Sequence, residues 1–263
     1  MCPSKTQGTV LIGHIPVVYQ IVTKDQRIKN LRSQRMLKAE GICKKYFRET
    51  DESNYFVAVE PVSLELKKGT LTTLMGRSGS GKSTFLSMLA GLLIPTEGKV
   101  FINGTDIYSL SDRDLSVFRN KNIGVIPQGY TALFNLTAAE NIMLPAGMHR
   151  DNIMQTEILR DRTRELMKRL GIYELKKVMP AHMSGGEMRR MAIARGIIND
   201  PGLILADEPT GDLDDENTAL VLGLFRELAD AGAAVLIVTH EETAREYADV
   251  KLSMTKGRIS YLN

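Results

Sequence analysis

The 263-residue chain has few cysteines, no long apolar run and no internal repeat. Its nearest approach to a membrane span, Val10 to Val22, is shorter than the roughly eighteen apolar residues that a span needs and is interrupted by polar residues. The same stretch lacks a small-residue cleavage site, which argues against a signal peptide. Cys2 and Cys43 form no CxxC pair and no disulfide framework, which is typical of a protein from a reducing cytosol.

Outside the N-terminal residues, positive and negative charges nearly balance. The net charge is +3, and residues 1–35 carry six lysines and arginines against Asp25 alone. The remainder is therefore slightly acidic and has no basic stripe that would indicate a nucleic acid partner. A basic arm can bind anionic lipid or nucleic acid. Because the first strand pattern begins abruptly at Leu37, we favour a poorly ordered N-terminal extension over residues 1–36, or a translation start at Met36.

What the chain does contain is a glycine-rich loop of the form G-x-x-x-x-G-K-[ST]. It follows an apolar, strand-like run at Thr70–Met75 and precedes a helical pattern at Phe85–Leu93, which is the context that a phosphate-binding loop requires and a chance glycine-rich turn lacks. Bare backbone amides and the helix N-terminus attract phosphate. Lys82 reaches the β- and γ-phosphates, and the Ser83 hydroxyl coordinates Mg²⁺. The predicted nucleotide contacts are Gly76, Arg77, Ser78, Gly79, Ser80, Gly81, Lys82, Ser83 and Thr84.

From Leu37 onward the chain alternates strand and helix patterns, which is typical of an α/β protein with buried strands. Between Thr137 and Ile198 the strand signals vanish and residues such as Ile158–Leu170 show helical spacing, so we predict an inserted helical subdomain over about residues 129–198 of a single domain at 37–263. The predicted strands are Leu37–Cys43, Tyr55–Leu66, Thr70–Met75, Lys99–Ile102, Ile123–Pro127, Leu203–Asp207, Ala234–Thr239, Val250–Met254 and Ile259–Leu262.

The apolar strand at Leu203–Asp207 ends in two adjacent carboxylates. A buried strand can deliver Asp207 to the site as a group that organises Mg²⁺, and Glu208 can direct the water that attacks the γ-phosphate. The alternative is that the pair caps a helix after Pro209. Capping explains the pair less well, because the four apolar residues before it indicate a buried strand that ends at the two acids.

A second glycine-rich segment, Ser184-Gly185-Gly186-Glu187, precedes a predicted helix at Met188–Ile198. The pattern S-x-x-E by itself is a capping box. Two consecutive glycines weaken a helix start unless the backbone must be bare, and bare amides at a helix N-terminus bind anions. From these residues alone, capping and anion binding are equally supported.

Together these motifs resemble those of the ATP-binding subunit of ABC (ATP-binding cassette) transporters, over about residues 37–263. They occur in family order: Walker A at Gly76–Thr84, the Q-loop at Pro127-Gln128, the signature at Met183–Glu187, Walker B at Leu203–Glu208, the D-loop at Gly211–Asp214 and the switch histidine at Thr239-His240. The signature departs from the family pattern in having Met183 for Leu and Glu187 for Gln. Residues 1–36 have no counterpart in that pattern.

The resemblance implies an α/β fold, with a P-loop NTPase core, an inserted helical subdomain and an antiparallel β region. It implies ATP and Mg²⁺ as ligands, bound between two head-to-tail cassettes so that the signature of one chain meets the γ-phosphate held by the other. Tyr46 is expected to stack on adenine; alternatively it packs on the sheet as an edge-strand residue. The remaining residues that the resemblance implies are Glu208, His240, Gln128 and Lys82 for catalysis, Ser83, Gln128 and Asp207 for the metal, and Ser184, Gly185, Gly186, Glu187 and Asp214 for nucleotide.

Asn141–Pro145 and Ala206–Asp214 are similar to the lipoprotein-releasing, macrolide-exporting and antimicrobial-peptide-resistance ATPases and to the bacterial cell-division cassette. We therefore expect an ATP-hydrolysing homodimer that drives a separate integral membrane permease from the cytoplasmic face, in export or extraction, without nucleic acid. A regulatory cassette of the cell-division type is one alternative. A soluble, non-transport cassette is another, although the chain has neither a second cassette nor a coiled-coil insertion. A small-molecule kinase would have no use for Ser184–Glu187 or His240.

Overall fold

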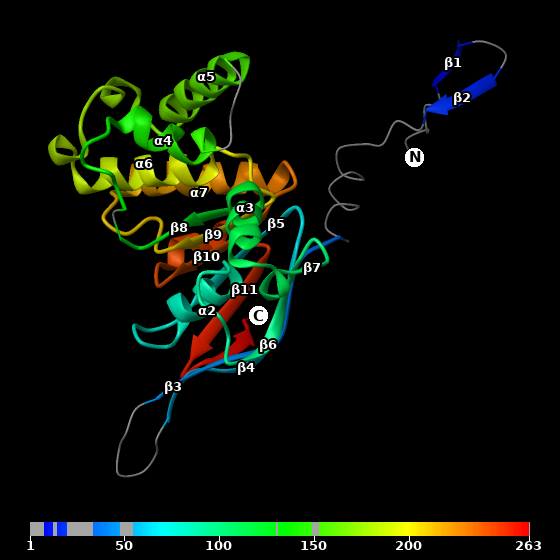
Figure 1. The fold of residues 1–263 in the computed structure, drawn as a ribbon, viewed down its shortest axis with the longest axis vertical. Helices are drawn as coiled ribbons and strands as arrows, with labels where there is room; N and C mark the ends of the chain where they lie inside the picture. The colour runs from blue at the N-terminus through cyan, green and yellow to red at the C-terminus, as the bar shows by residue number, and fades with distance from the viewer. Residues whose placement is uncertain are drawn as a thin grey trace, which may run out of the picture.

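The computed structural model describes residues 8–12, 15–19, 34–47, 55–129, 131–148 and 153–262 (Figure 1). Two short strands near the N-terminus, β1 (Gly8–Ile12) and β2 (Ile15–Tyr19), pair antiparallel. Most of the N-terminal extension predicted at residues 1–36 lies outside the described residues. Within the described part of the chain, no helix is both long enough and apolar enough to cross a bilayer.

A six-stranded sheet forms the centre of the molecule, in the order β12-β11-β5-β10-β9-β8. Its inner strands are parallel, and β12 alone pairs antiparallel, at the edge. Every residue of β5, β9 and β10 is buried, as expected for parallel strands covered on both faces. The six strands are β5 (Thr70–Met75), β8 (Ile123–Ile126), β9 (Leu203–Asp207), β10 (Ala234–Thr239), β11 (Val250–Thr255) and β12 (Arg258–Tyr261).

A second, antiparallel sheet has the order β4-β3-β6-β7 and lies at the opposite end of the molecule from the helical segment (Figure 1). Sequence analysis predicted its three long strands but not the two-residue β7. The strands β3 and β4 extend beyond the predicted bounds, and β3 begins at Arg35. The bounds are β3 (Arg35–Phe47), β4 (Tyr55–Lys67), β6 (Glu97–Ile102) and β7 (Thr105–Asp106).

The helices separate into two groups around the central sheet. Figure 1 shows α4, α5 and α6 stacked at one end of the molecule, with α7 between them and the sheet, and α2 on the other side near the antiparallel sheet. The helices are α2 (Lys82–Leu89), α3 (Asp112–Asn122), α4 (Ala138–Gly147), α5 (Ile153–Arg169), α6 (Gly185–Ile197) and α7 (Asp215–Asp230), with short 3-10 turns η1 (Ile107–Ser109), η2 (Tyr173–Leu175), η3 (Pro180–His182) and η4 (Glu242–Tyr247).

One helix prediction needs correction, and one helix was not predicted. The helix after the glycine-rich loop ends at Leu89 rather than Leu93, because Gly91 adopts a left-handed backbone (φ 67°). The Gly91 amide bonds to the Met88 carbonyl and the Leu92 amide to the Ser87 carbonyl, which is the Schellman pattern that terminates helices. The helix α3 was not predicted: none of its residues is fully buried, and only a few apolar side chains, among them Leu115 and Phe118, pack partly against the core.

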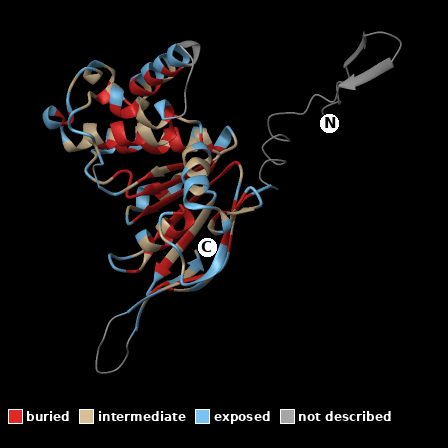
Figure 2. Ribbon diagram, in the orientation of Figure 1, coloured by how far each residue is buried: buried red, intermediate tan, exposed pale blue. Residues whose placement is uncertain are grey.

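Side chains of the central strands alternate between two apolar cores. Leu71, Val235 and Ile237 join the core under α4 to α7, whereas Leu74 and Leu236 join the core formed with α2 and the antiparallel sheet. Buried residues accordingly concentrate along the central strands in Figure 2. The sheet is thus held rigidly from both faces, which fixes where its strands end.

Candidate functional site

Walker A, the Q-loop, Walker B and the switch histidine lie at the ends of four neighbouring parallel strands. The register pairs Met75 of β5 with Thr239 of β10, and Val238 of β10 with Asp207 of β9. On the other side, Ala206 of β9 pairs with Ile126 of β8. The carboxyl ends of these strands therefore meet at one edge of the sheet, which is where α/β proteins bind ligands.

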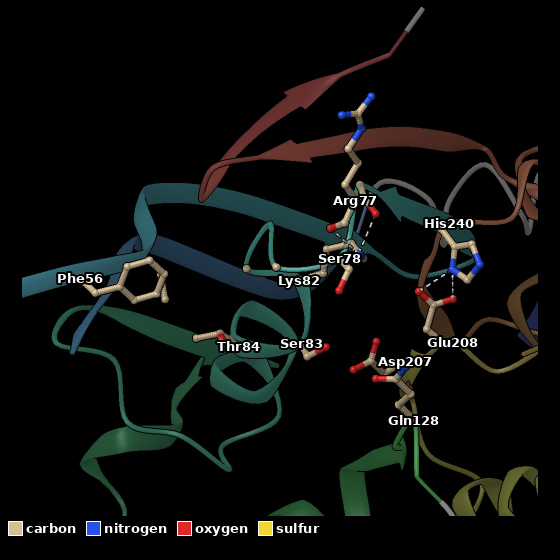
Figure 3. Close-up of a pocket in the computed structure, with 14 residues that line it drawn as sticks. Phe56, Arg77, Ser78, Lys82, Ser83, Thr84, Gln128, Asp207, Glu208 and His240 are labelled. Atoms are coloured by element: carbon tan, nitrogen blue, oxygen red, sulfur yellow. Dashed lines mark hydrogen bonds and ion pairs between the residues drawn. The ribbon is translucent and has the colours of Figure 1, made fainter. Parts of the chain in front are cut away.

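A cavity of about 660 Å³ lies at this edge (Figure 3), a volume suited to a small-molecule ligand. It brings together residues from all four motifs. Its lining consists of Phe56, Ala58, Gly76, Arg77, Ser78, Gly79, Gly81, Lys82, Ser83, Thr84, Gln128, Asp207, Glu208 and His240. Every one of these was predicted from sequence except Phe56 and Ala58.

The glycine-rich loop tolerates no side chain at two points. A Cβ on Gly76 would lie 2.4 Å from the Met254 carbonyl oxygen, and one on Gly81 would lie 2.3 Å from the Ala58 carbonyl oxygen. Gly81 also caps α2 with a φ of 106°, which L side chains rarely adopt. Because both positions lack a side chain, the backbone can pack this closely and leave bare amides at the start of α2. This is the arrangement that binds phosphate.

Lys82 is held at the floor of this cradle. Its side chain is buried, and its ammonium group donates to the Gly76 carbonyl at 2.7 Å and to the Arg77 carbonyl at 3.2 Å. The Arg77 side chain, by contrast, extends away from the carboxylates (Figure 3). Ser80 does not line the cavity: it is buried within the loop, and its amide donates to the Arg77 carbonyl at 3.2 Å.

Asp207 and Glu208 reach the cavity from the end of β9, and both are buried. Burial raises the pKa of the Asp207 carboxyl, and the adjacent Glu208 charge raises it further, whereas the Ser83 hydroxyl, Lys82 and Arg189 lower it. Glu208 has a left-handed backbone (φ 48°), which costs a non-glycine residue about 1–3 kcal/mol and is commonly tolerated at functional sites. Its amide donates to the Val238 carbonyl at 2.7 Å, which holds that conformation in place.

His240 and Glu208 lie next to each other at one end of the cavity and are bonded through their side chains (Figure 3). The imidazole Nδ1 lies 3.0 Å from the Glu208 carboxylate, and the Thr239 hydroxyl donates to the same carboxylate at 3.1 Å. The hydrogen bond to Glu208 is the main cause that raises the pKa of His240 above its ordinary 6.5. The His240 side chain is 70% exposed, so it remains free to rotate toward a ligand.

Phe56 lies at the far end of the cavity from His240 (Figure 3). It pairs directly with Tyr46 across β3 and β4, and directly opposed residues of antiparallel strands share one face. Tyr46 itself does not line the cavity; it is 40% exposed, and the Lys44 ammonium lies 5.4 Å from its ring centre. The sequence placed Phe56 in a predicted strand but did not predict it as a site residue. Its pairing with Tyr46 depends on the register of β3 against β4, which the sequence pattern does not give.

The remaining predicted site residues lie outside the cavity. Ser184 and Glu187 form a complete capping box at the start of α6: the Glu187 carboxylate accepts from the Ser184 amide at 2.7 Å, and the Ser184 hydroxyl accepts from the Glu187 amide at 3.3 Å. The side chain of Asp214 caps α7 by accepting from the Asn217 amide at 2.8 Å, a bond that lowers the pKa of its carboxyl. Gly186 packs against the D-loop, because a Cβ there would lie 3.2 Å from the Leu213 side chain.

A P-loop cradle, a buried Asp–Glu pair and a histidine at one edge of a parallel sheet define a nucleotide-hydrolysing ATPase of the P-loop class. Comparison with known families narrows this further. Residues 59–211 match the model of the ABC transporter family. The chain belongs to that family and is an ABC ATPase, so the sequence-based identification and fold class are confirmed.

The similar proteins agree with this assignment. The chain is 38% identical to the lipoprotein-releasing system ATP-binding protein LolD of Aquifex aeolicus, over 75% of this chain and 87% of that protein. It is also 38% identical to LolD 1 of Caulobacter vibrioides, over 86% of this chain and 94% of that one. Among solved structures, the dimeric post-hydrolysis state of the ATP-binding cassette MJ0796 bound to ADP and Pi has a TM-score of 0.80 at 33% identity, covering 87% of this chain and 99% of that one.

The contact between His240 and Glu208 should make the stability of the fold depend on pH. Because the folded-state pKa of His240 is raised, the pair stabilises the fold below the unfolded pKa of about 6.5, and that contribution is lost as pH rises through the folded-state pKa. We expect NMR titration of the His240 ring to give a midpoint above 6.5, and Glu208→Gln to lower it toward that value. An unchanged midpoint in the variant would show that Glu208 is not the cause.

Proposed function

We propose that this chain is the ATP-hydrolysing motor of a membrane export or extraction complex. One observation carries the proposal: the P-loop, Gln128, Asp207–Glu208 and His240 line a single cavity at the carboxyl edge of the sheet. Kinases and GTPases share the P-loop, but they do not need a Q-loop glutamine and a switch histidine in the same site.

The reaction is attack of water on the γ-phosphorus of ATP. A bond forms between the water oxygen and phosphorus, the bond to the ADP oxygen breaks, and Glu208 accepts the proton of the attacking water. Lys82 and the loop amides stabilise the charge that spreads over the phosphate oxygens. The structure has the His240 ring bonded to the Glu208 carboxylate. We propose that His240 moves to the γ-phosphate when ATP binds, which leaves Glu208 available to the water.

Mg²⁺ fits the residues at the centre of the cavity. Ser83, Gln128 and Asp207 offer a hydroxyl, an amide oxygen and a carboxylate there, and these hard oxygen donors together with phosphate are what Mg²⁺ prefers. No cluster of three or more His, Cys, Asp or Glu side chains suited to a metal occurs among the described residues, which agrees with an ion held partly by the nucleotide. When bound, Mg²⁺ neutralises charge on the phosphates.

The signature segment is proposed to bind the nucleotide held by a second copy of the chain. Ser184 and its capping box lie outside the cavity of their own chain, yet present bare glycine amides at the N-terminus of the 13-residue helix α6, a site that favours phosphate. The similar cassette solved with ADP and Pi is dimeric. We therefore propose a head-to-tail homodimer in which Ser184–Glu187 and Asp214 complete the site of the partner.

A separate integral membrane permease at the cytoplasmic face is the proposed partner. Several similar proteins are named ATP-binding proteins of lipoprotein-releasing systems, and another is a combined ATP-binding/permease protein, MacB, of which the match covers 29%. The match therefore leaves out most of that longer relative. A cassette that regulates assembly without transport, and a soluble cassette, are the alternatives that the experiments below separate.

Replacing Glu208 by Gln tests the catalytic role. Loss of a general base typically costs about 10²- to 10⁴-fold in rate, so Glu208→Gln should lower kcat for ATP by that order while a fluorescent ATP analogue still binds. Steady-state ATPase and equilibrium binding measure the two quantities. Unchanged turnover in this variant would refute the assignment of Glu208.

Affinity capture tests the partner. We expect Glu208→Gln protein, incubated with ATP in detergent-solubilised membranes, to retain an integral membrane protein more strongly than the same variant without nucleotide. A captured membrane protein with no substrate path would favour the regulatory cassette. Recovery of ribosomes or DNA-bound factors instead, with ATPase activity stimulated by nucleic acid, would support the soluble cassette.

Phe56, which lines the cavity, and Tyr46, which pairs with it across β3 and β4, are both proposed to contact the adenine base. Base–aromatic stacking is worth about 1–3 kcal/mol per contact, which corresponds to roughly five- to 150-fold in Kd. Tyr46→Ala and Phe56→Ala should therefore each weaken ATP binding by that order. Phe47→Ala is the matched control, because Phe47 follows Tyr46 on β3, packs edge-on against Tyr55 and is 71% exposed. Weakening by Tyr46→Ala alone would limit the base contact to Tyr46.

A further inference from the structure

Arg189 is a buried cation next to the proposed metal site. It lies on α6, five residues after Ser184, and is only 2% exposed. One guanidinium nitrogen donates to the Pro127 carbonyl at 2.8 Å, and the other donates to the Gln128 carbonyl at 2.5 Å. A planar guanidinium bridges two neighbouring acceptors through two separate nitrogens, whose relative positions are fixed.

Two further contacts attach the same stretch of chain to α6. Arg195 donates to the Thr131 carbonyl at 2.7 Å and also bonds the Thr131 hydroxyl. At Gly196 the helix approaches β8 so closely that a Cβ would lie 3.2 Å from the Val125 carbonyl oxygen. The end of β8, Gln128 and Thr131 are thus all held on one helix.

Arg189 holds the backbone of a residue that lines the cavity. Gln128 and Asp207 both line the cavity, and in Figure 3 the Gln128 side chain lies beside that of Asp207. Arg189 therefore fixes the backbone of one proposed metal ligand next to the other, while itself lying outside the cavity lining.

We propose that Arg189 is a positioning residue, which holds Gln128 beside Asp207 and thereby sets the affinity of the site for Mg²⁺-ATP. The inference rests on the proposed function, since it assumes the same nucleotide site. The helix α6 begins with the capping box of Ser184 and Glu187. Arg189 therefore connects the proposed metal ligand Gln128 to the helix whose N-terminus is proposed to contact the partner chain.

Titration of Mg²⁺ against a non-hydrolysable fluorescent ATP analogue tests the proposal without using activity. Removing a group that orients a metal ligand typically costs about 10- to 100-fold in metal affinity. We expect Arg189→Gln to raise the half-saturating Mg²⁺ concentration by that order while binding of the analogue without Mg²⁺ stays near the parent value. Arg226→Gln is the matched control, because Arg226 is also bonded to a carbonyl, that of Tyr247, and to Asp249, away from the cavity.

Combining Arg189→Gln with Gln128→Ala distinguishes positioning from a general loss of structure. If Arg189 acts through Gln128, the double variant should have the Mg²⁺ requirement of Gln128→Ala alone. Additive effects would overturn the proposal, as would a parent-like Mg²⁺ requirement in Arg189→Gln. Should Arg189→Gln fail to fold, judged by its melting temperature, Arg189→Lys takes its place, with an intermediate shift expected and a parent-like value again contrary. If the parent chain binds no nucleotide, the proposed function itself fails.

Discussion

The parallel alignment of β8, β9, β10 and β5 is the constraint on which the rest of the structure depends. Strands in one register and one direction bring their carboxyl ends to a common edge, so motifs separated by more than a hundred residues meet in one cavity. The two apolar cores that cover the sheet hold this register, because slipping one strand by a residue would exchange its side chains between the cores. Catalytic geometry and fold stability therefore depend on the same packing.

Buried charge is the second organising feature, and each buried group has identified partners. Lys82 is bonded to carbonyls of its own loop, Glu208 to His240 and Thr239, and Arg189 to carbonyls of the segment after β8. Burying charges without such partners would cost several kcal/mol per group.

Helix α6 connects features that a site-by-site description separates. Its N-terminus carries the capping box of the signature, its first turns carry Arg189, and its last turn approaches β8 at Gly196. The helix thus spans from a segment proposed to contact a partner chain to β8, the strand that precedes Gln128. Such an element can relay ligand binding as a rigid displacement, because packed interfaces shift between discrete arrangements more readily than they deform.

The motifs of the proposed site could be predicted from the sequence alone: the phosphate loop, the Asp207–Glu208 pair, Gln128 and His240 lie in short segments whose residue types and spacing reflect local backbone requirements. The strands at Thr70–Met75, Leu203–Asp207 and Ala234–Thr239 were predicted to the residue, since buried parallel strands are continuous apolar runs. Only the tertiary structure decided that Phe56 pairs with Tyr46, that Arg189 reaches the carbonyls of Pro127 and Gln128, and that His240 engages Glu208. Those contacts depend on hairpin register and on packing between residues about thirty to sixty positions apart, and neither leaves a periodic or local trace in the chain.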